Sequence, residues 1–180
     1  AELYALPWEL LTLKASGQHV GELAGVLLRY EWPETETVPE KPLPRHGGGR
    51  VVVAWSAAGG GVPAAEHVTT VTQACRSGCH PFDYSRDVIP NASFGGLSDV
   101  LSAAKREGRP ISVLHILCHG GAVRDTFGLV LDGEDPTESA GPVDAGMLRK
   151  LLAPHADMVR LVVIMACNSA DNGALGNQLG

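Results

Sequence analysis

Two reactive side chains follow two separate apolar segments of the chain. His119 comes directly after residues 111–118, and Cys167 comes directly after residues 161–166. Both segments are short runs rich in Leu, Ile and Val, which predict strands buried on both faces of a parallel sheet. Side chains just beyond the carboxyl ends of such strands gather at one edge of the sheet, where ligands bind. A thiol and an imidazole at that edge indicate a nucleophilic Cys–His site.

The two side chains have complementary roles in such a site. Cysteine attacks as a thiolate, and a nearby imidazole takes the thiol proton. The reaction also needs backbone N–H groups for the oxyanion, and each is worth on the order of 3 kcal/mol. Gly120 has no side chain to block a carbonyl oxygen, so the N–H groups of Gly120 and Cys167 are the predicted donors.

Two neighbours of His119 could compete for these roles. Successive side chains of a strand point to opposite faces, so Cys118 is predicted to point away from His119 into the core. His115 shares the face of His119 but lies about 13 Å away along the strand. We interpret it as a buried, hydrogen-bonded histidine.

Composition limits the class of protein. The 180 residues are 44% hydrophobic and 19% charged, enough for the core of one α/β domain. The net charge of −6 disfavours sequence-independent nucleic-acid binding, and the apolar runs are too short to span a membrane. Four cysteines are too few for a disulfide-stapled scaffold, so we expect reduced thiols and a cytoplasmic location.

Strands and helices are predicted to alternate after an N-terminal segment. An extension over residues 1–32, with a helix at 6–11 and a strand at 26–30, precedes a Pro/Gly-rich linker over 33–49. The remaining residues, 50–180, form the α/β core, and their alternation implies a mostly parallel sheet covered on both faces. The predicted strands are 50–55, 86–89, 111–118, 127–131 and 161–166. The predicted helices are 62–75, 97–105 (starting near Gly96 or Ser98), one from the N-cap Asp144 to Leu152, and one from Asp171.

Four motifs follow one another along the chain, at residues 7–11 (PWELL), 114–121 (LHILCHGG), 128–132 (GLVLD) and 161–170 (LVVIMACNSA). With these motifs, the order of elements resembles the CHAT family of bacterial caspase-related peptidases. The resemblance implies a caspase-like three-layer αβα sandwich, with a mostly parallel central sheet and catalytic residues His119 and Cys167. The family domain continues past the cysteine, which implies that a small-subunit-like part is absent from this chain through truncation or processing.

The resemblance implies a cysteine endopeptidase that cleaves a partner protein through an acyl-enzyme, without a cofactor or metal, in a bacterial signalling or defence system. A sensor or repeat protein is the expected regulator, and a small-subunit-like segment or second chain is expected to complete the cleft. The alternative is a catalytically silent module that keeps the fold for binding. Apolar Leu117 and Met165 disfavour cleavage after basic residues, while Asp132 and Asp171 are candidate substrate-binding residues.

Two further motifs have competing interpretations. The segment from Cys75 through Cys79 to His80 hints at a zinc site, but a third and a fourth ligand are not evident, so a helix exit is favoured. Gly59–Gly61 could be a nucleotide-binding turn, but it lacks the G-x-G-x-x-G spacing. A flexible loop near the cleft is the favoured interpretation.

Overall fold

The computed structural model describes residues 11–20, 23, 49–78, 80–123, 126–135 and 141–166. Its contacts divide the chain into two compact units, and each is described by itself. The first is Ala1–Thr37 with Gly180, and the second is Val38–Leu179. The predictions for residues 6–10, 26–30, 33–48 and the helix from Asp171 lie outside the described residues.

The described part of the first unit is a short antiparallel turn. Thr12 pairs with His19, and the Thr12 Oγ1 atom lies 3.1 Å from His19 Nδ1. Gly17, with φ of +70°, closes the turn and donates its N–H to the Leu13 carbonyl at 2.8 Å. The left-handed conformation at this position favours glycine.

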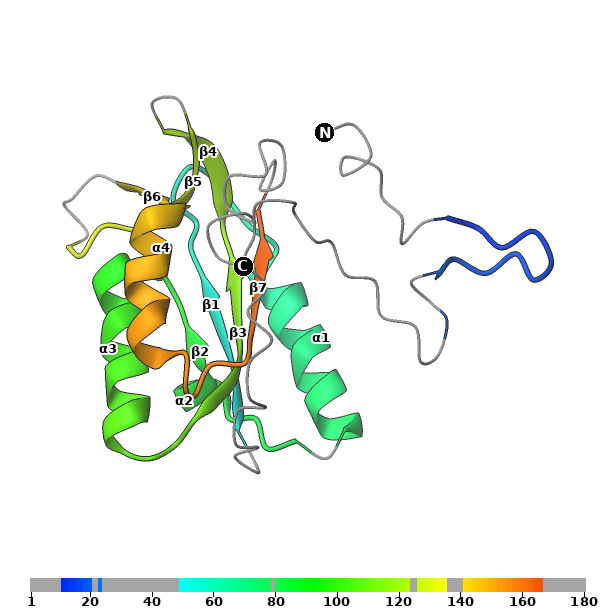
Figure 1. Cartoon of the computed structure of the whole chain (residues 1–180), viewed down its shortest axis with the longest axis horizontal. Coiled ribbons are helices and arrows are strands. Elements are labelled where there is room, and N and C mark those ends of the chain that lie inside the picture. The colour runs from blue at the N-terminus through cyan, green and yellow to red at the C-terminus, as the bar shows by residue number, and fades with distance from the viewer. Residues whose placement is uncertain are drawn as a thin grey trace. The chain divides into compact units, whose positions relative to one another are not determined.

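The second unit contains a sheet of four strands. They are β1 (Arg50–Trp55), β2 (Val88–Ile89), β3 (Ile111–Leu117) and β7 (Leu161–Met165), in the order β2-β1-β3-β7. All neighbouring pairs are parallel (Figure 1). The predicted parallel arrangement is confirmed, and β1, β3 and β7 agree with their predicted ranges to within one residue.

Helices pack on both faces of this sheet (Figure 1). α3 (Phe94–Arg106) and α4 (Ala145–Leu152) cover one face, and a 3-10 helix at Ala153–His155 follows α4. α1 (Ala64–Ser77) covers the other face. The core beneath α3 and α4 includes Val52, Ala54, Leu97, Leu101, Leu114, Ile116, Leu148 and Leu151. The smaller cluster beneath α1 consists of Val53, Val68 and Val88, with Trp55, Val71 and Phe82 packed against it.

A second, antiparallel sheet follows β3 directly. β4 (His119–Val123) pairs with β5 (Thr126–Leu131), which pairs with β6 (Gly141–Asp144). The predicted hairpin is confirmed. β6 was not predicted, since it begins with Gly and Pro, which are typical of turns. Asp144 caps α4 as predicted, and its carboxylate accepts the Met147 N–H at 2.8 Å.

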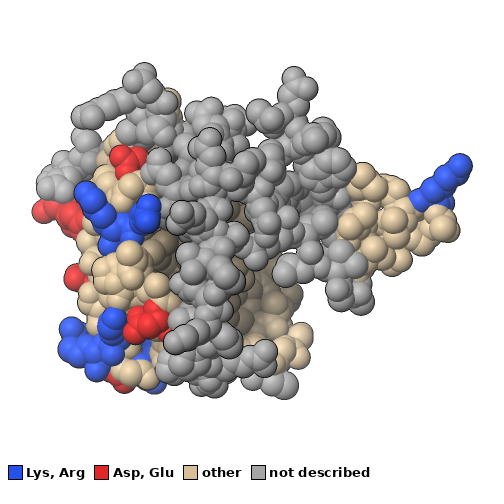
Figure 2. Space-filling view, viewed as in Figure 1, with Lys and Arg blue, Asp and Glu red and all other residues tan. Residues whose placement is uncertain are grey.

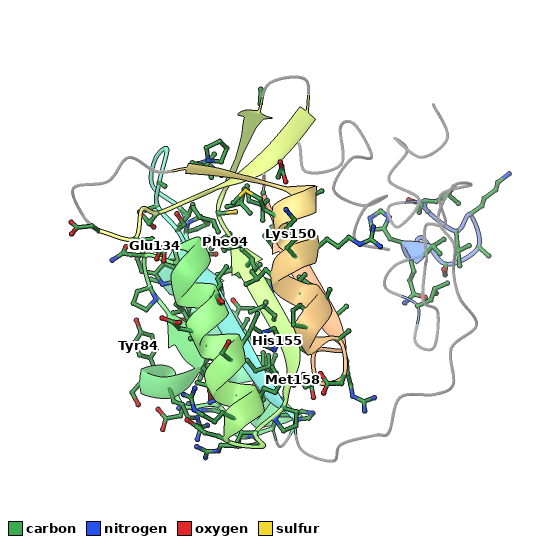
Figure 3. The ribbon with its side chains drawn as sticks, turned by 60° about the vertical axis from the view of Figure 1, so that its left-hand side comes forward. Tyr84, Phe94, Glu134, Lys150, His155 and Met158 are labelled. Atoms are coloured by element: carbon green, nitrogen blue, oxygen red, sulfur yellow. The ribbon has the colours of Figure 1, made fainter. Side chains whose placement is uncertain are left out.

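α3 begins earlier than predicted. Ser93 is its N-cap, and the Ser93 Oγ atom accepts the Gly96 N–H at 2.9 Å. The Glu134 carboxylate accepts the Ser93 hydroxyl at 2.7 Å and the Gly95 N–H at 2.6 Å. Figure 3 shows Glu134 beside Phe94 at this helix end. Two glycines in the first turn hide the start of the helix, because glycine has low helix propensity.

The predicted strand over residues 86–89 is wrong in its first half. A short helix, α2 (Tyr84–Asp87), precedes β2. The Asp87 side chain is fully buried, 2.8 Å from the Arg86 guanidinium and 3.4 Å from that of Arg50. Burial alone would raise the pKa of the Asp87 carboxyl, but hydrogen bonds and the two cations hold it below its ordinary value. These ionic contacts favour the helical turn over an extended chain.

Charged side chains of both signs are interspersed over the part of the α3/α4 side that Figure 2 shows. This mixture agrees with the modest net charge of −6. Among the helices that the structure describes, none is both long and apolar enough to cross a lipid bilayer.

Candidate active site

The carboxyl ends of β3 and β7 lie side by side. Their parallel pairing runs in register up to Leu117 and Met165. Just beyond it, the Cys118 N–H donates to the Met165 carbonyl at 3.1 Å. The prediction that these two strands are neighbours is confirmed, and His119 stands at the edge of the sheet where they end.

The imidazole of His119 is packed between a hairpin and a glycine turn. His119 begins β4 and pairs with Val130 of β5. On the other side, a Cβ added to Gly59 would lie 3.7 Å from His119 Cβ, and one added to Gly60 would lie 3.3 Å from Nε2. His119 Nε2 is excluded from solvent and has no hydrogen-bond partner within the described part of the chain. The Nε2 edge of the imidazole faces Gly60.

The glycine contacts of His119 are the part of the site that sequence reasoning missed. The sequence placed Gly59–Gly61 near the cleft but gave no partner for it. Gly59 and Gly60 have φ values of +87° and +144°, which L side chains rarely adopt. Consecutive glycines between a strand and a helix were the available signal, but only the tertiary structure identifies what they approach.

The other predicted catalytic groups are described only in part. Gly120 is half-buried in β4, opposite Leu129 of β5. Cys167, with the second predicted oxyanion donor, lies outside the described residues, as does Asp171. Ala166 is described and packs against the α3/α4 core, at the same edge of the sheet as His119.

Asp132 lies at the same end of the parallel sheet. Its N–H donates to the Ala92 carbonyl at 3.0 Å, and the Ala92 N–H donates to the Trp55 carbonyl, at the end of β1, at 2.8 Å. The Asp132 Oδ2 atom is buried and lacks a hydrogen-bond partner among the residues that are described. An unpartnered carboxylate oxygen here keeps Asp132 a candidate for binding substrate.

Cys118 belongs to the core. It packs beneath α3 and α4 and is 4% exposed. Burial raises the pKa of its thiol to about 11, in spite of a hydrogen bond with the Val130 backbone. At neutral pH almost none of this thiol is ionised, so Cys118 is a poor nucleophile.

His115 is half-buried, and the hydrogen bond predicted for it is not present at its Nε2 atom. Its Nε2 atom has no partner among the described groups, and its ring lies 4.8 Å from that of His67 on α1. Burial, and then the charge of His67, lower the pKa of the His115 imidazole. The group that lies against His115 on α1 is another half-buried ring. A hydrogen bond at the other ring nitrogen, Nδ1, stays a prediction.

The motif that begins at Cys75 lies at the end of α1, as the favoured interpretation expected. Cys75 is a buried free thiol near the end of α1, and its carbonyl accepts the His80 N–H at 2.8 Å. Cys79 lies outside the described residues. Across residues 11–20, 23, 49–78, 80–123, 126–135 and 141–166, no three His, Cys, Asp or Glu side chains are placed to hold a metal ion.

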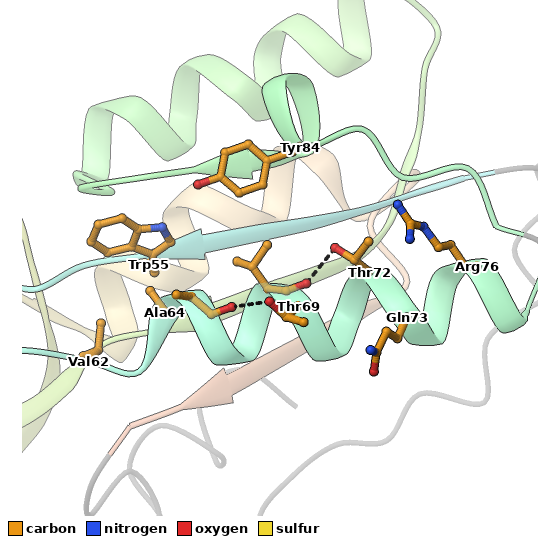
Figure 4. A pocket seen from close by; sticks show the side chains of 10 residues that line it. Trp55, Val62, Ala64, Thr69, Thr72, Gln73, Arg76 and Tyr84 are labelled. Carbon is orange, nitrogen blue, oxygen red and sulfur yellow. Dashed lines mark hydrogen bonds between the residues drawn. The ribbon is translucent and has the colours of Figure 1, made fainter.

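A groove of about 560 Å³ runs along α1 on the side of β1 (Figure 4). Trp55 and Tyr84 stand on its sheet side, and Arg76 lies toward the end of α1. The hydroxyls of Thr69 and Thr72 donate to carbonyls of their own helix at 2.8 and 2.7 Å. The groove is therefore lined largely by apolar surface.

Two comparisons with known proteins bear on the identity of this chain. A search of curated proteins gave no match. The family model of the CHAT domain matches residues 1–179. The chain therefore belongs to the CHAT domain family. Its site is built from the paired ends of β3 and β7 and from the hairpin that begins at His119.

Proposed function

We propose that this chain is a caspase-like cysteine endopeptidase domain, with Cys167 as nucleophile and His119 as general base and acid. The observation that carries the proposal is the β3–β7 register. Leu117 and Met165 are paired, and His119 and Cys167 each follow two residues later in the sequence. Membership of the CHAT family, which is associated with cysteine peptidase-like proteins, supports the same chemistry.

The reaction has two steps. His119 takes the thiol proton, and the Cys167 thiolate forms a bond to the scissile carbonyl carbon. The N–H groups of Gly120 and Cys167 donate to the oxyanion. When the C–N bond breaks, His119 gives its proton to the leaving amine, which leaves a thioester on Cys167. Water, deprotonated by His119, then hydrolyses the thioester and regenerates the thiol.

The finer features of the proposal follow the family resemblance. We propose a three-layer caspase-like sandwich, completed by a small-subunit-like segment or second chain. The substrate would be a partner protein, with a sensor or repeat protein as regulator in a bacterial signalling or defence system. The proposed location is cytoplasmic.

The proposed substrate preference is an apolar or small residue before the cleaved bond. Leu117 is buried, whereas Met165 is 45% exposed beside the end of β3. An exposed thioether there offers apolar contact, which favours neutral side chains. Asp132 and Asp171 are the candidates for a polar contact with substrate.

An acyloxymethyl ketone peptide and a peptide library test this function on the full chain. We expect a covalent adduct on Cys167 and library cleavage in the wild type and in the Cys118→Ala variant. Cys167→Ala should lose both, and His119→Ala should slow both by about 100-fold or more. An adduct on Cys118 would contradict the assignment of the nucleophile. A folded wild-type chain with neither adduct nor cleavage would instead support a silent binding module.

A further inference from the structure

The turn between β1 and α1 is fixed to the strand that ends at His119. The buried Ser56 donates its N–H to the Leu117 carbonyl at 2.9 Å. The Ala58 N–H donates to Ser56 Oγ at 3.2 Å, and the Gly60 N–H donates to the Ala57 carbonyl at 3.0 Å. These bonds make the turn a defined structure rather than the flexible loop expected from its glycines.

The turn lies against the ring of His119, and at Gly60 it is close enough that an added side chain would be tight. A Cβ on Gly60 would lie 3.3 Å from Nε2 and 3.8 Å from Cε1, while one on Gly59 would lie 3.9 Å from Cδ2. The approach thus covers the Nε2 edge of the ring. A Cβ added to Gly61, the next residue, would have no atom within 4 Å. The contact is therefore specific to the first two glycines.

We infer that Gly59 and Gly60 are positioning residues that hold the His119 imidazole and exclude water from its Nε2 atom. This inference rests on the proposed peptidase function. The evidence for it is the buried Nε2 atom, which has no hydrogen-bond partner among the described residues, together with two glycines at positive φ whose backbone lies against the ring. A methyl group at Gly60 would push the imidazole or shift the turn, because 3.3 Å is tighter than most Cβ contacts.

The chain supplies two matched controls for Gly60→Ala. Gly61→Ala adds a methyl group to the same turn in open space. Gly108→Ala adds one at φ of +64°, also with no atom within 4 Å, so it places an alanine at positive φ without the contact. Comparing Gly60→Ala with Gly108→Ala separates the effect of the ring contact from a general loss of stability caused by an alanine at positive φ.

The test measures three quantities on the full-length variants. The first is the NMR resonances of the His119 ring, which report the contact whether or not the protein cleaves peptides. The second is the pH profile of Cys167 alkylation by iodoacetamide. The third is kcat and KM on the best library peptide. Melting temperatures measured in parallel report stability.

For Gly60→Ala we expect moved His119 ring resonances, a changed alkylation profile and a kcat lower by about 10- to 100-fold at similar KM. Gly61→Ala should match the wild type, and Gly108→Ala should lose stability but keep its kcat. Unmoved ring resonances in Gly60→Ala, or an equal loss of kcat in Gly108→Ala, would overturn the inference. A wild type without His119-dependent alkylation of Cys167 would instead refute the peptidase function, and with it the catalytic purpose of the turn.

Discussion

The two faces of the parallel sheet differ in what they bury. Beneath α3 and α4, Leu114 and Ile116 of β3 and the next residue on the same face, Cys118, contribute to a large apolar core. Toward α1, the same strand presents His115, which lies against the His67 ring. The apolar cluster on the α1 side is small, and only Val68 and Cys75 of α1 are buried.

This difference explains how adjacent residues can have opposite roles. Cys118 points into the apolar core, where burial raises the pKa of its thiol. His119, the next residue, lies against the glycine turn that leads to α1. The alternation of side chains along a strand thus separates packing from chemistry. We expect substitutions on the α3/α4 face to change stability and those on the α1 face to change reactivity or pH dependence.

The largest effect is expected from Leu148→Ala on α4. Leu148 is fully buried, so its loss should lower the free energy of unfolding by about 2–5 kcal/mol. Its neighbour Met147 is 36% exposed, and Met147→Ala should stay within about 0.5 kcal/mol of the wild type. Urea unfolding measures both, and equal losses would show that the α3/α4 face is not the principal core.

A smaller effect is expected from Cys118→Ala. Removing a buried sulfur from this core should cost about 1 kcal/mol of unfolding free energy and leave Cys167 alkylation unchanged. Cys118→Ser should cost more, because it buries a hydroxyl among apolar groups. Denaturation curves and mass spectrometry of iodoacetamide adducts provide the test. Rapid modification of Cys118 in the folded protein would contradict the separation of the two faces.

The smallest effect concerns pH and the α1 face. The lowered pKa of His115 means that the unfolded chain takes up a proton first as the pH falls below 6.5. Above pH 6.5 this histidine is neutral in both the folded and the unfolded state, and the protein has its full stability. As the pH falls from 6.5 toward the lower pKa of the folded state, the free energy of unfolding declines. His115→Phe should flatten this decline in thermal melts taken from about pH 7.5 to about pH 5, whereas the same change at exposed His80 should not. An unchanged pH profile for His115→Phe would show that protonation of this half-buried ring is not coupled to folding.

Sequence alone could predict the strands that carry the site. The apolar runs of β1, β3 and β7 are long enough to identify, and Asp144 is a clear helix cap. Their pairing follows from the rule that parallel strands with buried faces form one sheet. The edge at which His119 lies was therefore predictable.

Other features depend on contacts between distant residues. α3 starts at Ser93 with help from Glu134, which lies far along the chain. α2 is stabilised by Asp87 and its arginines, including Arg50. The approach of Gly60 to His119 likewise joins two segments that only the fold brings together. No local pattern contains such information.

The brevity of β2 has a consequence for how this protein behaves in concentrated solution. β2 pairs with β1 through only two residues, Val88 and Ile89, and Pro90 follows without an N–H to donate. A strand from another molecule that paired with this edge strand could form few backbone hydrogen bonds. The short β2 therefore disfavours self-association by strand addition at this edge of the sheet.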